Sequence, residues 1–367
     1  MRSERLAKVA VSRRRVVGAM ALTPAMAALQ VRLGFGSSPA SAQDAIVCTM
    51  VTDTAGLGDQ NFNDLANKGG TDAATDFGIE WKVIESQDAA AYVPNLTAGA
   101  EGGDLTVGVG FLLTDAITDV AEDFPDDFFL LIDSVSEVEN VQSVTFKEQE
   151  PSFLCGVAAA RLTRTGKLGL VGGERIPPVI RYEVGFRAGA LSINPDIEFT
   201  IAYADSFGDP AKGKELALAQ FNQDADIVFP VAGLTGVGCY EAVKERNNLG
   251  AEWVIGADVS QDHLAPGFEL CTARKGVDFA VYEGCKQVVE GTFAGGVFNL
   301  GINEGGVGFE DSGNKVPADI MGLIAAYQQM IVDGDLVVPA TDEELEAFEA
   351  PPIPDPIEAS PVASPSA

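Results

Sequence analysis

The feature that most constrains the fold is a regular alternation of short apolar runs with longer amphipathic segments, which begins at Ile46. Each short run is apolar almost throughout, as in Phe128–Ile132, and is rich in residues that favour strands. Runs of this kind are typical of parallel strands covered by helices on both faces. The alternation therefore predicts an α/β fold.

The alternation runs through the chain twice. The strands expected in the first unit are Ile46–Thr52, Trp81–Glu85, Leu105–Gly110, Phe128–Ile132 and Val141–Phe146. Those expected in the second unit are Leu168–Gly172, Phe199–Ala204, Ile227–Val231, Trp253–Ala257 and Leu270–Arg274. Val297–Leu300 and Val307–Phe309 are expected to be short pieces at sheet edges. The sequence thus predicts two successive doubly wound parallel-sheet units of similar size.

The segment Glu198–Lys214 places a large aromatic side chain at the end of a strand. After the strand come the turn residues around Gly208, and Asp209 followed by Pro210 is the pattern of a helix N-cap. Phe207 is therefore expected at a loop tip outside the carboxyl end of a strand, where open α/β sheets bind ligands. Its ring either packs under a neighbouring loop or stacks on a flat ligand.

The loop Asp53–Asp64 follows the first strand and also carries candidates. Its glycines do not form a GxGxxG fingerprint and the first basic residue after it is Lys68, so a dinucleotide site is disfavoured. The loop offers the ring of Phe62 beside the amide of Asn63. Asn63 is either a ligand-binding residue, a helix N-cap, or both.

Three further candidates lie at the ends of other strands. Asp115, after the glycines of the third strand, could accept a hydrogen bond from a ligand or cap the helix that it begins. Asp258 follows a buried strand and could grip two adjacent hydroxyl groups, or be an ordinary turn residue. Lys275 could pair with Asp258 or reach the same hydroxyl groups.

Catalysis and metal binding are poorly supported. His263 is the only histidine, and neither HExxH nor GxSxG occurs. Glu148 and Glu150 form a carboxylate pair, which we expect to be a solvated surface. The five cysteines lack CxxC spacing, so no metal site or cofactor is expected, although one disulfide, such as Cys271–Cys285, is possible.

The charge of the chain limits its partners. With 54 acidic and 24 basic residues, the formal net charge is −30. No basic stripe is present that could neutralise phosphates, so binding to nucleic acid or to anionic lipid is not expected.

The two ends of the chain have compositions of their own. Residues 1–42 resemble a twin-arginine signal peptide, with Arg13-Arg14 before a modest apolar stretch and Ala40-Ser41-Ala42 as the cleavage site. A membrane anchor is the weaker alternative, because the apolar run is short. We therefore expect export to the periplasm or the cell surface. Residues 339–367 form an acidic and then Pro-, Ser- and Ala-rich tail: a short helix is expected at Thr341–Glu349, and Pro351–Ala367 is expected to be disordered.

Eight ordered motifs between Ile46 and Val338 give the chain a family resemblance. They are DQNFND (59–64), VGVGFLLTDA (107–116), FKEQEPSFLCG (146–156), TGKLGLVGG (165–173), SFGDPAKGKELAL (206–218), VAGLTGVG (231–238), GADVSQD (256–262) and NEGGVGF (303–309). Together they resemble the basic membrane protein family of ABC-transporter substrate-binding proteins, whose best-known members are purine nucleoside receptors.

The resemblance implies a type I periplasmic-binding-protein fold, with two lobes joined by a three-crossover hinge and a ligand held between them. It implies that the first lobe comprises residues 43–147 and 275–305, and the second residues 148–274 and 306–338. It assigns roles to seven residues: Phe62 and Phe207 as stacking rings, Asn63 and Asp115 as readers of the base, Asp258 and Lys275 as partners of the ribose hydroxyls, and Gly233 as backbone clearance near the ligand.

The implied function is that of a monomeric, extracytoplasmic binding protein that delivers a nucleoside to an ABC permease and has no enzymatic activity. Two departures stand out: the family is usually lipid-anchored, and Asn67 stands where members often carry a bulky aromatic residue. A flavin, a sugar or another small solute is the alternative ligand, and a sensor or signalling receptor is the alternative role. A nucleoside hydrolase would need a metal-binding aspartate cluster, which the sequence does not show.

Overall fold

The computed structural model describes residues 45–357. The expected signal peptide, residues 1–42, lies outside the described residues, as does the end of the expected tail, residues 358–367. Between residues 45 and 357, no helix has both the length and the apolar character needed to cross a bilayer.

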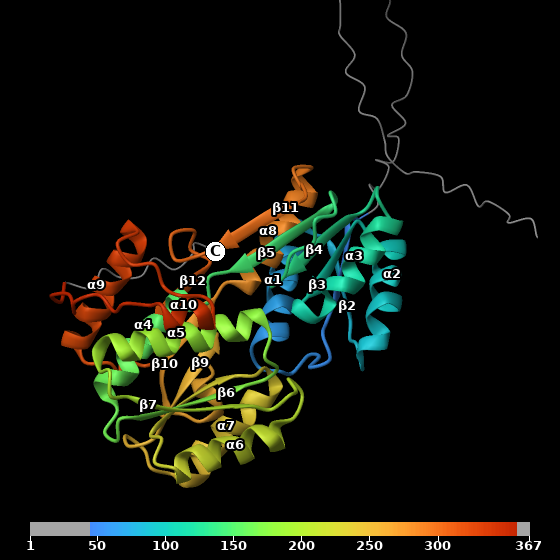
Figure 1. Cartoon of the computed structure of the whole chain (residues 1–367). Helices are drawn as coiled ribbons and strands as arrows, with labels where there is room; N and C mark the ends of the chain where they lie inside the picture. The colour runs from blue at the N-terminus through green and yellow to red at the C-terminus, as the bar shows by residue number, and fades with distance from the viewer. Residues whose placement is uncertain (1–44, 358–367) are drawn as a thin grey trace, which may run out of the picture. The chain divides into compact units, whose positions relative to one another are not determined.

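Two six-stranded sheets form the framework of the described residues (Figure 1). The first sheet has the order β2-β1-β3-β4-β5-β11, and its strands are β1 (Val47–Val51), β2 (Glu80–Ile84), β3 (Leu105–Val109), β4 (Phe128–Ile132), β5 (Val141–Phe146) and β11 (Gly296–Leu300). The second has the order β7-β6-β8-β9-β10-β12, and its strands are β6 (Lys167–Gly172), β7 (Glu198–Tyr203), β8 (Ile227–Val231), β9 (Trp253–Asp258), β10 (Glu269–Lys275) and β12 (Val307–Glu310). Neighbouring strands pair in parallel except β12, which is antiparallel to β10. The predicted pair of doubly wound parallel-sheet units is confirmed, with β11 and β12 at the edges.

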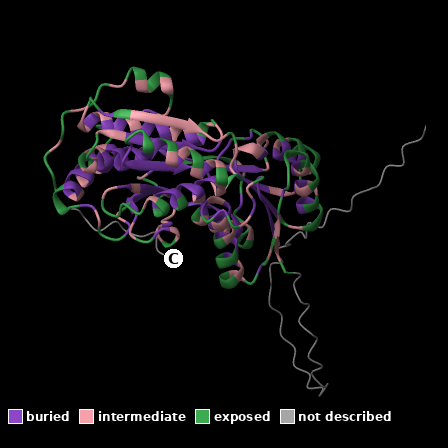
Figure 2. Cartoon of the chain, turned by 90° about the horizontal axis from the view of Figure 1, so that it is seen from below, coloured by how far each residue is buried: buried purple, intermediate pink, exposed green. Residues whose placement is uncertain are grey.

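Helices cover both faces of each sheet, which explains why the strands are apolar on both sides. On the first sheet, α1 (Phe62–Phe77) and α8 (Val277–Glu290) pack on one face, and α2 (Tyr92–Gly102) and α3 (Thr114–Asp123) on the other. On the second, α4 (Gln149–Leu162), α5 (Pro177–Ile193) and α9 (Ala318–Asp333) pack on one face, and α6 (Pro210–Asn222) and α7 (Leu234–Arg246) on the other. Figure 2 shows buried strands enclosed by helices whose outer faces are exposed.

The chain passes between the two sheets three times, and we call each sheet with its helices a lobe. The passages lie between β5 and α4, between β10 and α8, and between β11 and β12. Hydrogen bonds join the first passage to the third: Lys147 N–H donates to Leu300 O (3.0 Å), and Ile302 N–H donates to the Glu150 carboxylate (2.7 Å). The three passages match the hinge that the family resemblance implies.

Glu148 and Glu150 differ from the expectation of a solvated surface, since both are buried. Glu150 accepts the hydrogen bond from Ile302 in the third passage. Glu148 lies between two cations, with Lys275 Nζ at 3.1 Å and Arg181 Nε at 2.5 Å from its carboxylate oxygens. Partners from distant segments, two cations for Glu148 and a backbone N–H group for Glu150, therefore compensate the burial of this pair.

The cysteines also differ from the expectation. All five are buried and free, and Cys271 lies in the second sheet whereas Cys285 lies in α8 on the first, so the suggested bond between them is not formed. The neighbour of Cys271 is Cys155, and that of Cys285 is Cys48. Burial among apolar side chains is the usual setting of a free cysteine.

The segment after the last long helix is more ordered than its composition predicts. Residues 342–346 form the short helix α10, and Asp342 pairs with Arg175 at 2.5 Å. The Phe348 ring contacts the Phe153 ring edge-on, with the two ring centroids 6.4 Å apart, and Ile357 N–H donates to Gly322 O (3.1 Å). The short helix expected at Thr341–Glu349 is present as α10, whereas the expectation of disorder from Pro351 on is wrong for residues 351–357.

Candidate functional site

A pocket lies between the two sheets, at the carboxyl ends of their strands. Its wall includes Asp53, Gly110 and Asp133 after strands of the first sheet, and Ala232, Gly233, Asp258 and Lys275 at strand ends of the second. In both sheets the strand order reverses beside these loops, between β1 and β3 and between β6 and β8. This topological switch point is where doubly wound sheets bind ligands.

The loop after β1 is held by two buried aspartates that bind Asn63. Asp59 accepts hydrogen bonds from the backbone N–H groups of Asn61, Asn63 and Asp64. The Asn63 side-chain amide donates to Asp53 (2.9 Å) and to Asp59 (3.2 Å). The N-cap of α1 is Asn61, so Asn63 lies inside the helix rather than at its cap. Its Oδ1 is buried and has no hydrogen-bond partner among the described residues.

Two phenylalanine rings line the pocket, one from each lobe. Phe62 begins α1, and Phe207 occupies the loop between β7 and α6 as expected. Asp209 caps α6 by accepting from Lys212 N–H. Phe207 lies against Gly173 and Gly233, and a Cβ at Gly173 would come within 2.3 Å of its ring. Both rings are only partly buried, so neither is consumed by the core of its own lobe.

Lys275 brings charges from both lobes and the hinge together. Its ammonium lies 2.5 Å from Asp133, which follows β4 in the first lobe, and 3.1 Å from Glu148 in the first passage. It also lies 5.0 Å from the centroid of the Phe62 ring, within the range of a cation–π contact. Lys275 therefore pairs directly with Asp133 and Glu148, whereas the sequence had indicated Asp258 as its partner.

Asp258 follows the buried strand β9 and is itself buried. Tyr182, from α5, donates its hydroxyl hydrogen bond to one carboxylate oxygen (2.7 Å). Asp258 has a positive φ of 64°, and Asp133 likewise has a φ of 69°. Two non-glycine residues in this sparsely populated region, both in one pocket wall, are typical of functional sites.

Six of the seven residues predicted from sequence meet in this pocket: Phe62, Asn63, Phe207, Gly233, Asp258 and Lys275. Asp115 does not line it, because it lies in the first turn of α3 with its side chain exposed. Sequence analysis missed Asp133 and Tyr182. The position of Asp133 directly after a strand, the same signal that indicated Asp258, could have found it.

The pocket wall carries more acid than base. Burial raises the pKa of Asp53, Asp258 and Asp59, the last to about 7. Burial also raises the pKa of Asp133, to about 6, although Lys275 opposes the rise. Burial lowers the pKa of Lys275, but the carboxylates of Asp133, Glu148 and Asp258 outweigh this and raise it overall. Within residues 45–357 no cluster of three His, Cys, Asp or Glu side chains is placed to hold a metal ion.

Comparison with known proteins supports the family resemblance that the sequence motifs indicate. A family model described as "ABC transporter substrate-binding protein PnrA-like" matches residues 46–342. The chain is 33% identical to the ABC transporter nucleoside-binding protein BmpA of Lactococcus lactis subsp. cremoris, over 89% of this chain and 99% of that protein. It is 30% identical to basic membrane protein A of Borreliella burgdorferi, over 79% and 87% of the two chains.

A solved structure shows that the likeness extends to the fold. A solute-binding protein of an ABC transporter system from Aeropyrum pernix K1 superposes with a TM-score of 0.76 at 31% identity, over 82% of this chain and 96% of that one. These relatives are substrate-binding proteins rather than enzymes. The chain therefore belongs to the Bmp family of PnrA-like ABC-transporter substrate-binding proteins.

Proposed function

We propose that this protein captures a nucleoside, preferentially a purine nucleoside, outside the cytoplasm and delivers it to an ABC permease. The observation that carries the proposal is the pair Phe62 and Phe207, one from each lobe, in the wall of a single pocket. A flat base between the two rings would gain about 1–3 kcal/mol from each stacking contact.

The charges of the pocket favour a neutral ligand that is rich in hydrogen-bond donors. Four aspartates line it against one lysine, and that lysine already pairs with Asp133. A phosphate group would meet these carboxylates without a free cation to compensate, which is costly in a buried site. The ribose hydroxyls and ring N–H groups of a nucleoside instead match acceptors such as Asp258, Asp53 and Asn63 Oδ1.

The proposed location follows from the relatives. One relative, 32% identical over 87% of this chain, is an uncharacterized lipoprotein of Pyrococcus abyssi. Lipoproteins and solute-binding proteins of importers act outside the cytoplasmic membrane. The export signal expected in residues 1–42 agrees with that location. We propose that the protein acts as a monomer that docks on its permease.

Calorimetry with inosine, guanosine, inosine monophosphate, riboflavin and glucose tests the proposal. We expect micromolar or tighter binding of the nucleosides and at least tenfold weaker binding of the monophosphate. Phe207→Ala should weaken nucleoside binding by about 1–3 kcal/mol, roughly 5- to 150-fold, and by more than Asn63→Ala does. Phe298→Ala, which removes an exposed ring in β11, is the matched control and should leave binding unchanged. Equal affinities for wild type and Phe207→Ala would remove the stacking role, and binding of glucose alone would overturn the nucleoside assignment.

A further inference from the structure

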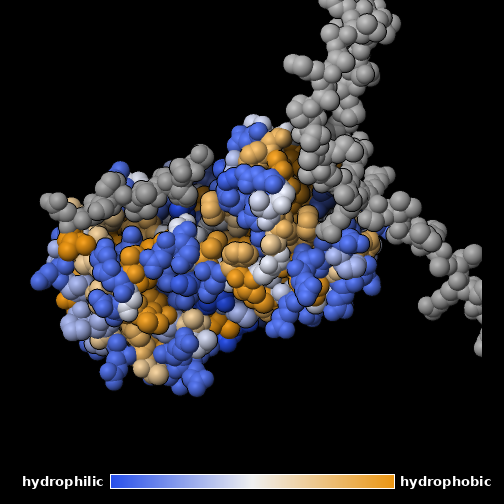
Figure 3. Space-filling model, turned by 90° about the horizontal axis from the view of Figure 1, so that it is seen from above, coloured by the Kyte–Doolittle hydropathy of each residue, from blue (hydrophilic) through white to orange (hydrophobic). Residues whose placement is uncertain are grey.

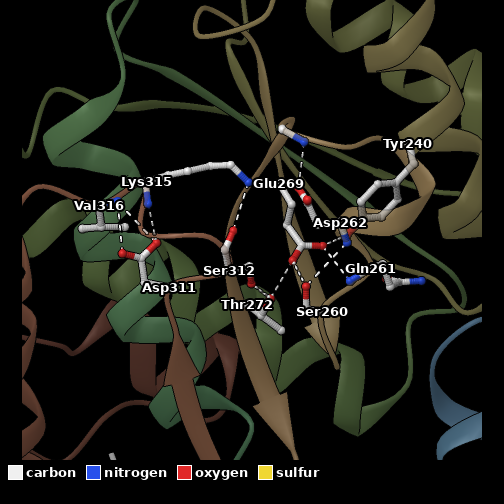
Figure 4. Close-up of polar contacts among 11 residues, drawn as sticks. Tyr240, Ser260, Gln261, Asp262, Glu269, Thr272, Asp311, Ser312, Lys315 and Val316 are labelled. Atoms are coloured by element: carbon white, nitrogen blue, oxygen red, sulfur yellow. Dashed lines mark hydrogen bonds and ion pairs between the residues drawn. The ribbon is translucent and has the colours of Figure 1, made fainter. Parts of the chain in front are cut away.

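A buried carboxylate in the second lobe has no contact with the pocket but is fully engaged. Glu269 begins β10 and has 0% of its surface exposed. One of its oxygens accepts from Ser260 Oγ (2.7 Å) and Thr272 Oγ1 (2.9 Å), and the other from Tyr240 Oη (2.6 Å) and Gln261 N–H (2.8 Å) (Figure 4). Four donors compensate a buried charge that has no ion-pair partner in residues 45–357.

The strand itself is deformed to make this arrangement. Residues three apart in a regular strand point to opposite faces of the sheet. The pairing of β10 with β9 shifts register between Glu269 and Thr272, and the Thr272 hydroxyl can then donate to the Glu269 carboxylate. Irregularities of this kind redirect a side chain at a chosen point in a sheet.

Two of the four donors to Glu269 belong to the residues that follow the pocket aspartate. Asp258 has a φ of 64°, and Val259 N–H donates to Ala257 O (2.7 Å), which makes Asp258 the central residue of a γ-turn. The positive-φ form of this turn is rare and unfavourable for a residue with a side chain. Such a turn persists only where the surrounding structure imposes it. Ser260 and Gln261 follow the turn directly, and their hydrogen bonds to Glu269 hold the chain that leaves it.

The segment that follows the turn, Val259–Leu264, also contacts the other lobe. His263 Nε2 lies 3.1 Å from Oε1 of Gln60, in the loop after β1. Asp262 is fixed in turn, since its Oδ1 accepts from Gly267 N–H (3.0 Å) and Lys315 Nζ (2.9 Å) (Figure 4). The segment Val259–Leu264 therefore connects the pocket residue Asp258 to a contact between the lobes.

We propose that Glu269 is a positioning residue that holds the γ-turn at Asp258 and thereby sets the grip of this carboxylate on the ligand. The effect on the turn is independent of what the ligand is, whereas the effect on affinity rests on the proposed function. Glu269 does not touch the ligand and acts only through Ser260, Gln261 and the turn that precedes them.

Hydrogen–deuterium exchange on the ligand-free, full-length protein tests the effect on the turn. Glu269→Gln should speed amide exchange at least tenfold in the peptide that spans 257–264. The matched control is Asp226→Asn, because Asp226 is also buried and accepts from Thr163 Oγ1 (2.6 Å) and Arg164 N–H (2.6 Å), next to the opposite ends of the strands. This variant should leave peptide 257–264 unchanged. Unchanged exchange in Glu269→Gln would overturn the proposal. If Glu269→Gln does not fold, Tyr240→Phe, which removes one of the four donors to Glu269, is used in its place.

Calorimetry with inosine and 2′,3′-dideoxyinosine tests the effect on the grip. Glu269→Gln should weaken inosine binding about tenfold and leave dideoxyinosine binding nearly unchanged, because only inosine offers the hydroxyl pair to Asp258. Combining it with Asp258→Asn should cost less than the sum of the two single changes, since both act on one contact. Equal losses for both nucleosides, or full additivity, would overturn the link to Asp258. If wild type binds neither nucleoside while exchange rises as expected, the proposed function fails and the positioning of the turn stands.

Discussion

Burial sets the charges of the pocket at the scale of single residues. Asp59 does not rely on a cation: it is surrounded by backbone N–H groups and the Asn63 amide at the start of α1. Desolvation nevertheless outweighs these hydrogen bonds and raises its pKa to about 7. The first loop of the pocket is thus built on a carboxyl group whose protonation changes near neutral pH.

The raised pKa of Asp59 predicts a pH dependence of stability. Its pKa is about 7 in the folded protein, against an ordinary value of 3.8 for an aspartate, so between these values the folded state binds more protons than the unfolded state. The contribution of Asp59 to the free energy of unfolding should therefore be highest below about pH 4. It should fall by a few kcal/mol between about pH 4 and pH 7 and level off above pH 7.

Urea unfolding of the ligand-free protein between pH 5 and 8 measures this fall. Asp133, with a pKa of about 6, and the buried Asp53 and Asp258, whose pKa values are also raised, add to the slope, so the part due to Asp59 is the difference between wild type and Asp59→Asn. Asp59→Asn should make the fall shallower. Asp224→Asn, which changes a side chain that is 76% exposed, should not. A stability that rises between pH 6 and 7 would contradict the prediction.

The positions of pocket residues were predictable where a distinctive side chain stands at or just beyond the end of a strand. Asp258 stands out because it follows an apolar run directly, and Phe207 because it is a large ring at the tip of the loop after such a run; both reach the pocket. Glu148 was misjudged because the cations that bury it, Lys275 and Arg181, come from distant parts of the chain. Asp115 was misplaced because α3 turns its side chain to solvent, which the strand-end pattern does not reveal.

At the scale of elements, the bounds followed the sequence closely because hydrophobic periodicity and turn residues agree. The strand Phe128–Ile132 was predicted at its observed bounds, whereas α4 begins at Gln149, ahead of the helix Ser152–Thr163 that the apolar pattern predicts. The early start of α4 depends on the burial of Glu148 and Glu150 in the hinge. That burial involves contacts with distant residues, which the local sequence does not reveal. The order of residues 351–357 likewise depends on packing against the second lobe, where Ile357 N–H donates to Gly322 O, and has no local signal.

The helix pair α4 and α5 gives a second prediction. The two helices approach closely through glycines: a Cβ at Gly189 would lie 2.0 Å from Phe153 O, a backbone atom that cannot move aside cheaply. Gly189→Ala should therefore force the helices apart and destabilise the protein by about 3 kcal/mol. Since α5 carries Tyr182, the affinity for a ligand should fall as well.

Differential scanning fluorimetry measures this loss of stability. Gly102→Ala is the matched control, because Gly102 ends α2 and a Cβ there would meet no atom within 4 Å. Alanine is the better helix former, so this control should be neutral or stabilise the protein slightly. A thermal midpoint for Gly189→Ala within 1 °C of wild type would show that the helices can separate without cost.

At the scale of the whole molecule, the charge of −30 is the dominant property. On the face shown in Figure 3, hydrophilic residues lie among smaller hydrophobic patches. Many of the ion pairs are at the surface, as in Lys68–Asp72 with side chains 58% and 51% exposed, and pairs of this kind contribute little. Repulsion among the remaining carboxylates therefore opposes the compact state.

This repulsion predicts that salt stabilises the protein. The Debye length falls from about 30 Å at 0.01 M to about 8 Å at 0.15 M, so most long-range repulsion is screened within that range. The thermal midpoint in NaCl should rise steeply up to about 0.2 M and then level off. Screening depends on ionic strength rather than on the identity of the anion, so NaCl and Na₂SO₄ should coincide at equal ionic strength below 0.2 M. A midpoint that climbs steadily with concentration and differs between the two salts would instead indicate exclusion of salt from the protein surface. In that case self-repulsion would not be what limits the stability of this acidic binding protein.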